Sequence, residues 1–261
     1  MTVGRWGAAT ALGRIRSVNE DSYVASPPVF VVADGMGGHA AGDIASRIAA
    51  DEFETLAGLH SVVVDEALAA IDRANEAILN AAGRDQTRVG MGTTVTGLIS
   101  VVAAGIDHWI VFNIGDSRVY RLDGGRLEQL TTDHSEAEEM VASGRITREE
   151  ARSYGRRNVV TRSLGTSPSP VPDSWVFPPR TADRFILCSD GLTLELHDVE
   201  IEARANVISS PQLLAQDLVD RAVAAGGRDN VTVIVVDGPN TFDNSDVDEN
   251  TAPRAIPLEG Y

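Results

Sequence analysis

Short apolar segments rich in valine and isoleucine recur along this chain, each bounded by glycine, aspartate or asparagine. Segments of this length and composition predict β-strands. The expected strands are Val29–Ala33, Thr93–Val102, His108–Ile114, Arg118–Leu122, Arg126–Leu130, Arg184–Cys188 and Val231–Val236. Asp123-Gly124-Gly125 stands between the fourth and fifth of them and predicts a hairpin turn.

Helical periodicity is grouped between the strands and does not alternate with them. Apolar residues repeat at helical spacing over residues 64–78 and again over residues 213–223. The alanine-rich segment Gly42–Leu59 is also expected to be helical. Two helices thus follow one another with no strand between them, which does not fit a βαβ chain. We therefore expect an α+β fold with mostly antiparallel strands.

Two parts of the chain differ in composition from this framework. Residues 131–170 are rich in charge and poor in apolar side chains, and they predict a mobile excursion with short helices near Ser135–Ser143 and Thr147–Ser153. Residues 239–261 offer little to bury and predict an acidic, disordered tail. The expected folded domain is therefore residues 1–238.

The charges of the chain exclude several classes of function. All 22 basic residues are arginine, against 38 acidic residues, so the formal net charge is −16. This negative field repels nucleic acid and anionic membranes, and neither is an expected partner. Without lysine, the phosphate-loop, kinase and Schiff-base chemistries are excluded. Because the chain has one cysteine, no long apolar run and no secretion signal, we expect a cytoplasmic protein.

Acidic residues stand at the ends of several expected strands. They occur in Asn19-Glu20-Asp21, Asp34-Gly35, Gly115-Asp116-Ser117-Arg118, Asp190-Gly191 and Arg228-Asp229-Asn230. In two of these segments a strand delivers a carboxylate onto a glycine turn, although Asp-Gly alone is a common turn dipeptide. Carboxylates placed together repel one another unless protons or cations neutralise them, and oxygen ligands favour Mg²⁺, Mn²⁺ or Ca²⁺. The residues alone leave open whether the five segments meet in space.

Taken together, these segments resemble the metal-dependent protein phosphatase family, the type 2C Ser/Thr phosphatases, in its bacterial form. The motifs that carry the resemblance are Arg16-Ser17-Val18-Asn19-Glu20-Asp21, Asp34-Gly35-Met36-Gly37-Gly38-His39, Met91-Gly92-Thr93-Thr94, Gly115-Asp116-Ser117-Arg118, Ser189-Asp190-Gly191-Leu192 and Arg228-Asp229-Asn230-Val231-Thr232. The similarity runs from about Gly7 to Val236. It implies a four-layer sandwich of two antiparallel β-sheets flanked by α-helices on both faces, with residues 131–165 as a variable flap beside the site.

The resemblance also implies an activity and its metal ligands. Family members hydrolyse phosphoserine and phosphothreonine on proteins by in-line attack of a water that bridges two Mn²⁺ or Mg²⁺ ions. Asp34 matches the aspartate that bridges both ions, and Gly35 matches the residue whose carbonyl joins their coordination shell. Asp190 and Asp229 match the carboxylates that complete the binuclear site.

Other positions are matched to supporting roles. Asp21, and more weakly Glu20, match acidic groups that hold metal-bound waters. Asp116 matches the aspartate that, with Asp190, holds a third and weaker ion in bacterial members. Arg16 matches the arginine that grips the substrate phosphate, which suits a planar guanidinium that can bind two phosphate oxygens at once.

One position departs from the family. Animal members carry a histidine directly after the Asp-Gly, proposed as the acid that protonates the leaving alkoxide, and here that position is Met36. The identity of the general acid therefore stays open. The resemblance implies phosphorylated protein substrates, made by Ser/Thr kinases, and a monomeric enzyme.

Three other functions fit the residues less well. Gly35–Ala40 has the dinucleotide-binding pattern, but Asp34 would place a negative charge beside the pyrophosphate, and the following helix leads into another helix. A cysteine phosphatase would need arginine six residues after Cys188, where Leu194 stands. A non-catalytic phosphoprotein-binding member would have no need to keep three clustered acids.

Overall fold

The computed structural model of the chain describes residues 3–37 and 41–239. Its elements in chain order are β1 Trp6–Ala11, β2 Asp21–Ser26, β3 Val29–Met36, α1 Gly42–Glu54, α2 Val64–Arg84, the 3₁₀ turn η1 Gln86–Arg88, β4 Gly92–Thr93, β5 Val95–Ala103, β6 Ile106–Ile114, β7 Arg118–Asp123, β8 Arg126–Gln129, α3 Glu136–Ala142, α4 Arg148–Ser153, β9 Asp173–Phe177, β10 Arg184–Cys188, α5 Asp190–Thr193, α6 Asp198–Val207, α7 Pro211–Ala225 and β11 Val231–Asp237. The expected tail lies outside the described residues apart from Pro239. No helix in the described ranges is long and apolar enough to cross a bilayer.

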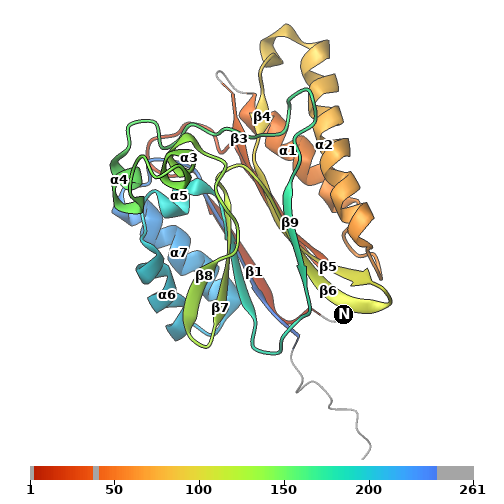
Figure 1. The fold of residues 1–261 in the computed structure, drawn as a ribbon, viewed down its shortest axis with the longest axis vertical. Helices are drawn as coiled ribbons and strands as arrows, with labels where there is room; N and C mark the ends of the chain where they lie inside the picture. The colour runs from red at the N-terminus through yellow and green to blue at the C-terminus, as the bar shows by residue number, and fades with distance from the viewer. Residues whose placement is uncertain (1–2, 38–40, 240–261) are drawn as a thin grey trace, which may run out of the picture.

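Two antiparallel sheets form the centre of the fold. One has the strand order β1-β11-β10-β7-β8, and the other has the order β2-β3-β5-β6-β9, with β4 beside β3. Helices α1 and α2 cover the second sheet, whereas α5, α6 and α7 cover the first, as Figure 1 shows. The expected α+β fold, a four-layer sandwich, is confirmed.

Side chains alternate between the two faces of each strand, and together they form three separate apolar layers. In β3, Val31 and Ala33 pack against α1 and α2, whereas Phe30 and Val32 pack between the two sheets. Strands β10 and β11 divide their side chains in the same way. Asp34 continues the Phe30 and Val32 row, so this alternation brings its carboxylate to the end of the layer between the sheets.

Two expected elements end differently in the structure. The expected strand Thr93–Val102 is interrupted, because Thr94 leaves the ladder between β4 and β5 to bond with the backbone of Asp34. The expected helix Gly42–Leu59 stops at Glu54. Gly58 adopts a left-handed φ of +74° and donates its N–H to the Pro27 carbonyl at 2.9 Å, which turns the chain back toward the sheet.

The turn between β7 and β8 and the flap helices follow the expectations. Gly124 and Gly125 have φ of +57° and +87°, the pair of positive values that a two-residue type I′ hairpin requires. In the flap, the Ser135 side chain caps α3 by accepting the Glu138 N–H at 3.3 Å. Thr147 caps α4 in the same manner. Strands β1, β2 and β9 and helix α6 were not expected.

Candidate active site

The predicted acidic residues come from both sheets and meet at one end of the sandwich. Asp21 in β2 stands directly opposite Asp34 in β3. Asp190 begins α5 just after β10, and Asp229 lies just before β11; both of these strands belong to the other sheet. Asp116 lies between β6 and β7, at the junction of the sheets. The five segments that the sequence left scattered are therefore neighbours in the fold.

Burial and neighbouring negative charges raise the pKa values of four of these carboxylates. Burial raises the pKa of Asp34 well above its ordinary value of 3.8, and the charges of Asp21, Asp190, Asp116 and Asp229 raise it further. Burial, followed by the charge of Asp116, raises the pKa of Asp190 in the same direction. Burial raises the pKa of Asp116 to about 7 and that of Asp21 to about 6. At neutral pH this cluster favours binding of positive charge.

Unpartnered carboxylate oxygens test whether the cluster fits divalent cations. Oδ1 of Asp21 and Oδ1 of Asp190 are buried and have no hydrogen-bond partner among the described residues. Leaving a buried charged oxygen without a partner is costly, and an all-oxygen donor set suits Mg²⁺ or Mn²⁺. In residues 3–37 and 41–239 no group of three or more acidic, imidazole or thiol side chains is already arranged so that it could hold a metal ion. The oxygen-only donor set of the cluster nevertheless fits the chemistry of the predicted ions.

Two threonines hold the backbone of Asp34. The Thr93 hydroxyl and the Thr94 N–H both donate to the Asp34 carbonyl at 2.9 Å. The Asp34 N–H donates to the Thr94 hydroxyl at 3.0 Å, and that hydroxyl shares a 2.9 Å bond with the Ser117 hydroxyl, next to Asp116. Thr93, Thr94 and Ser117 belong to the family motifs, but their role in holding the Asp34 backbone was not predicted. Nothing in a Thr-Thr pair indicates such a contact.

Asp21 is held by residues of the opposite sheet. Its Oδ2 accepts the Ser189 hydroxyl at 2.8 Å and the Thr232 hydroxyl at 2.7 Å. Ser189 precedes Asp190 and Thr232 lies in β11, so the carboxylate of one sheet is oriented by hydroxyls of the other. No local motif predicts that these hydroxyls bond to Asp21, because their separation from it along the chain is too large.

The glycines of the two Asp-Gly pairs are needed for space. A Cβ on Gly35 would lie 2.1 Å from the Gly42 carbonyl oxygen, and a Cβ on Gly191 would lie 1.9 Å from the Asn230 carbonyl oxygen. The expectation of a glycine turn is wrong for both, because Gly35 lies within β3 and Gly191 lies within α5. Close backbone packing explains these glycines, and it fixes the direction of the preceding aspartates.

Arg16 lies at the exposed edge of the acidic cluster. Its guanidinium donates to Asp229 Oδ2 at 2.7 Å and lies 3.7 Å from Glu20 Oε2. The charges of Asp229, Glu20 and Asp34 all raise the pKa of Arg16, after the hydrogen bond to Asp229. The residue predicted to bind phosphate therefore stands beside the residues predicted to bind metal, and it stays cationic.

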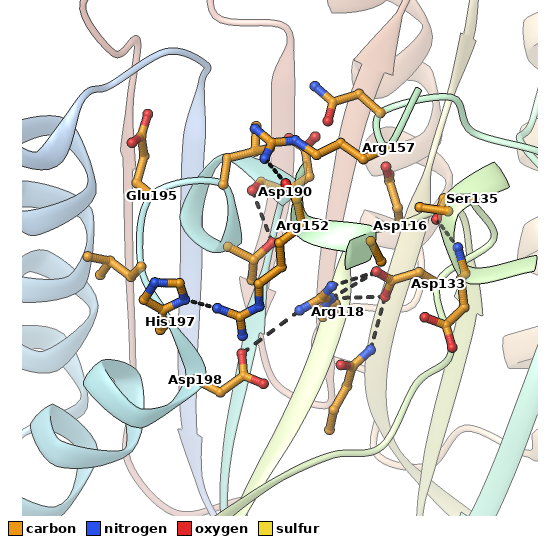
Figure 2. A pocket seen from close by; sticks show the side chains of 18 of the residues that line it. Asp116, Arg118, Asp133, Ser135, Arg152, Arg157, Asp190, Glu195, His197 and Asp198 are labelled. Carbon is orange, nitrogen blue, oxygen red and sulfur yellow. Dashed lines mark hydrogen bonds and ion pairs between the residues drawn. The ribbon is translucent and has the colours of Figure 1, made fainter. Parts of the chain in front are cut away.

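A cavity of about 380 Å³ opens beside these acids, under the flap. Asp116 and Asp190 form part of its wall, whereas the other predicted site residues lie outside its lining (Figure 2). The flap contributes α3 and α4 to the opposite wall. If a substrate side chain binds at the acidic cluster, the substrate residues next to it would therefore lie in this cavity.

The base of the flap is fastened to the loop that carries Asp116. Gly115 donates its N–H to His134 Nδ1 at 3.1 Å, and the His134 N–H donates to the Gly115 carbonyl at 2.9 Å. On its other side, His134 Nε2 lies 3.2 Å from Asp173 Oδ2. The flap and the predicted third-ion ligand therefore share one hydrogen-bonded unit.

Known protein families and curated proteins resemble this chain over most of its length. A family model described as Protein phosphatase 2C matches residues 16–238. The serine/threonine phosphatase stp of Listeria welshimeri is 36% identical over 242 residues, which cover 87% of this chain and 93% of that protein. The serine/threonine protein phosphatase PstP of Mycobacterium tuberculosis is 37% identical over 243 residues, which cover 89% of this chain and 45% of PstP.

Solved structures show the same likeness in three dimensions. The crystal structure of the Mycobacterium tuberculosis serine/threonine phosphatase PstP/Ppp is similar with a TM-score of 0.83 at 35% identity, covering 89% of this chain and 97% of that one. A structure of the PstP catalytic domain in complex with two manganese ions has a TM-score of 0.80 at 34% identity, covering 90% and 98%.

Proposed function

Because this chain belongs to the protein phosphatase 2C family, we propose that it is a metal-dependent enzyme that removes phosphate from phosphoserine and phosphothreonine on proteins. One observation carries the proposal: carboxylates from both sheets meet at one place and keep buried oxygens without partners. The catalytic domain spans residues 1–238, with residues 131–165 as its flap. The enzyme acts as a cytoplasmic monomer on products of Ser/Thr kinases.

Asp34, the Gly35 carbonyl, Asp190 and Asp229 would hold two Mn²⁺ or Mg²⁺ ions, and Asp21 and Glu20 would orient waters beside them. When bound, the ions supply Lewis acidity, which lowers the pKa of water and offsets the charge of the phosphate. Asp116, together with Asp190, is placed to hold a third, weaker ion. The shared pKa shifts of these acids and the oxygen-only donor set support this assignment.

The chain itself supplies position and charge. The Thr93 and Thr94 clamp fixes the backbone of Asp34, and the Ser189 and Thr232 hydroxyls fix the orientation of Asp21. Arg16 binds the substrate phosphate and holds it at the cluster. Met36 has a thioether that carries no proton, so the leaving alkoxide is protonated by another group.

The proposal is tested with synthetic peptides that carry one phosphothreonine. The purified protein with Mn²⁺ is expected to release inorganic phosphate from them, to lose this activity in EDTA and to regain it when Mn²⁺ is restored. Phosphate release is measured over time, with a phosphotyrosine peptide of the same sequence as the comparison. Release that is unaffected by the chelator would overturn the metal-dependent mechanism, and no release under saturating Mn²⁺ would favour a non-catalytic member.

Replacing Arg16 by alanine is expected to raise KM for a phosphopeptide by about 10- to 100-fold, because one hydrogen bond between charged groups contributes about 1.5–3 kcal/mol. Steady-state KM and kcat are measured at saturating Mn²⁺, which compensates for the lost contact with Asp229. Arg14→Ala, two residues away in the same exposed segment, is the matched control and should leave KM unchanged. An unchanged KM in Arg16→Ala removes the phosphate-binding role.

A further inference from the structure

The cavity under the flap is lined by arginine side chains beyond those that the proposed reaction uses. Five arginines contribute to its lining: Arg118, Arg148, Arg152, Arg157 and Arg228. Six carboxylates line it as well, those of Asp116, Asp133, Glu138, Asp190, Glu195 and Asp198. Arginine is also the side chain best suited to bind phosphate or carboxylate groups through two parallel hydrogen bonds.

Three of these arginines are neutralised by carboxylates of the same cavity. Arg118 donates to Asp133 at 2.6 Å, and Arg148 donates to Glu138 at 2.9 Å. Arg228 holds both oxygens of Glu195, at 2.9 and 3.1 Å. Because these three arginines are paired with carboxylates of the protein, we expect them to contribute little to binding an external anion.

Arg152 and Arg157 are different. In the part of the chain that the structure describes, neither forms an ion pair with a carboxylate. Arg152, on the flap helix α4, donates from Nη1 to His197 Nδ1, and Arg157 Nη1 donates to the Arg152 carbonyl at 2.5 Å. Each guanidinium has five N–H donors, so most of them are free. Arg157 lowers the pKa of Glu195 through its charge, but Arg228 already occupies that carboxylate.

The neighbouring acid, Asp198, does not neutralise this pair. Its Oδ1 accepts the Tyr120 hydroxyl at 3.1 Å and lies 3.9 Å from Arg118. His197, whose Nδ1 contacts Arg152 Nη1, lines the same part of the cavity. Figure 2 shows Arg152 reaching toward His197 within the wall that also contains Asp190. Unpaired donors therefore share one cavity with the proposed metal ligands.

We propose that Arg152 and Arg157, with His197, form a subsite for a second anionic side chain of the substrate, near the phosphorylated residue that is hydrolysed. The proposal rests on the function proposed above. A peptide whose phosphoresidue reaches Asp190 passes its neighbouring residues through the cavity, where a phosphate or a carboxylate meets unneutralised guanidinium groups. The substrates are then acidic or multiply phosphorylated segments, whose charge the rest of this acidic protein repels.

The test uses one phosphothreonine peptide in which a second position is scanned over four residues on each side as alanine, glutamate or phosphoserine. At the best position, kcat/KM is expected to be about tenfold higher for the anionic residue than for alanine, the effect of one good charge-assisted contact. A larger gain for phosphoserine than for glutamate identifies phosphate as the preferred ligand, and equal gains identify any anion.

Arg152→Gln and Arg157→Gln, singly and together, are expected to abolish this preference and to leave hydrolysis of the alanine peptide unchanged. Glutamine keeps an amide N–H donor, but it is shorter than arginine and carries no charge. Arg148→Gln, on the same helix but paired with Glu138, is the matched control and should keep the preference.

Three results would overturn the subsite. These are equal hydrolysis of all peptides by the wild type, a preference that survives in the double variant, or an equal loss on every peptide, which would make the arginines only a tether for the flap. Each leaves the proposed function intact, since the wild type still hydrolyses the alanine peptide. Failure to hydrolyse any peptide with Mn²⁺ instead contradicts the function itself.

Discussion

An Asp34→Asn variant is expected to hydrolyse phosphopeptides on the order of 10³-fold more slowly than the wild type at saturating Mn²⁺, with its fold intact. Asparagine keeps the shape of the side chain but removes the charge that binds the cations, whose contribution to the transition state is several kcal/mol, and each 1.36 kcal/mol is a factor of ten in rate. Single-turnover and steady-state rates measure the loss, and titration with Mn²⁺ measures the change in ion affinity.

Asp123→Asn is the matched control, because it changes the aspartate of another Asp-Gly pair. Asp123 lies in the β7–β8 hairpin with a side chain that is 57% exposed, and it pairs only with Arg180 among the described residues. Its variant should keep wild-type kcat. Near-wild-type kcat in Asp34→Asn would show that the proposed ligand assignment is wrong.

Without metal, the Asp34→Asn variant should be more stable than the wild type at high pH. The folded pKa of Asp34 lies above its ordinary value of 3.8, so the folded wild type binds more protons than the unfolded chain in the window between those values. The stability that Asp34 contributes is full below about pH 4 and is lost as pH rises through the folded pKa. Asparagine does not titrate, so in EDTA the variant should have the higher Tm at pH 8, and the two proteins should converge near pH 4.

Thermal melts at pH 4 and pH 8, with EDTA and with Mn²⁺, check this prediction. Mn²⁺ should stabilise the wild type more than the variant, because only a ligand that binds the folded state raises Tm. If the variant is no more stable than the wild type in EDTA at pH 8, carboxylate repulsion is not a feature of the folded protein.

The second large effect concerns stability. Arg121→Ala is expected to lower the free energy of unfolding by about 3–5 kcal/mol, because it leaves the buried Asp183 carboxylate without its cationic partner and with only the Arg180 N–H on Oδ2. Arg121 donates to Asp183 Oδ1 at 2.5 and 2.8 Å, and the two side chains are only 11% and 2% exposed. The Arg121 guanidinium also lies 5.7 Å from the centre of the Phe177 ring in the other sheet.

Urea unfolding measures this loss as a lower midpoint with an unchanged m-value. Adding Asp183→Asn to Arg121→Ala should recover part of the stability, since it removes the unpaired charge. The matched control is Arg73→Ala, whose partner Glu52 is at the surface, with side chains 43% and 29% exposed; there the change should stay within about 1 kcal/mol. A loss in Arg121→Ala no larger than in this control would contradict the argument.

The sequence predicted the layers of the fold and the residues of the site better than the contacts that hold them. Valine-rich strands and the absence of a strand between α1 and α2 predicted an α+β fold with mostly antiparallel strands, and the family resemblance implied the sandwich. Strands β1, β2 and β9 were missed because their residues are largely half-buried or exposed and lack a continuous apolar run. Edge strands of this kind derive their conformation from the neighbour they pair with, which composition does not reveal.

In the site, the ordered motifs indicated every acidic residue, and the fold brings Asp21, Asp34, Asp116, Asp190 and Asp229 together. The supporting contacts could not be predicted, because Thr94, Ser117, Ser189 and Thr232 reach their partners across 23 to 211 residues of chain. The reason for the Asp-Gly glycines was also misjudged, since the clash of a Cβ with Gly42 or Asn230 exists only after folding. Hydroxyl and glycine roles set by distant backbone are visible only in three dimensions.

The Ser189 and Thr232 hydroxyls orient Asp21 from the opposite sheet. The geometry of the site therefore depends on how the two sheets are aligned. A change in the layer between the sheets, such as Trp109→Ala or Phe185→Ala, would shift that alignment far from any ligand. Activity would then fall at temperatures where the protein is still fully folded. We therefore expect loosened packing between the sheets to lower activity before it appears in a melting curve.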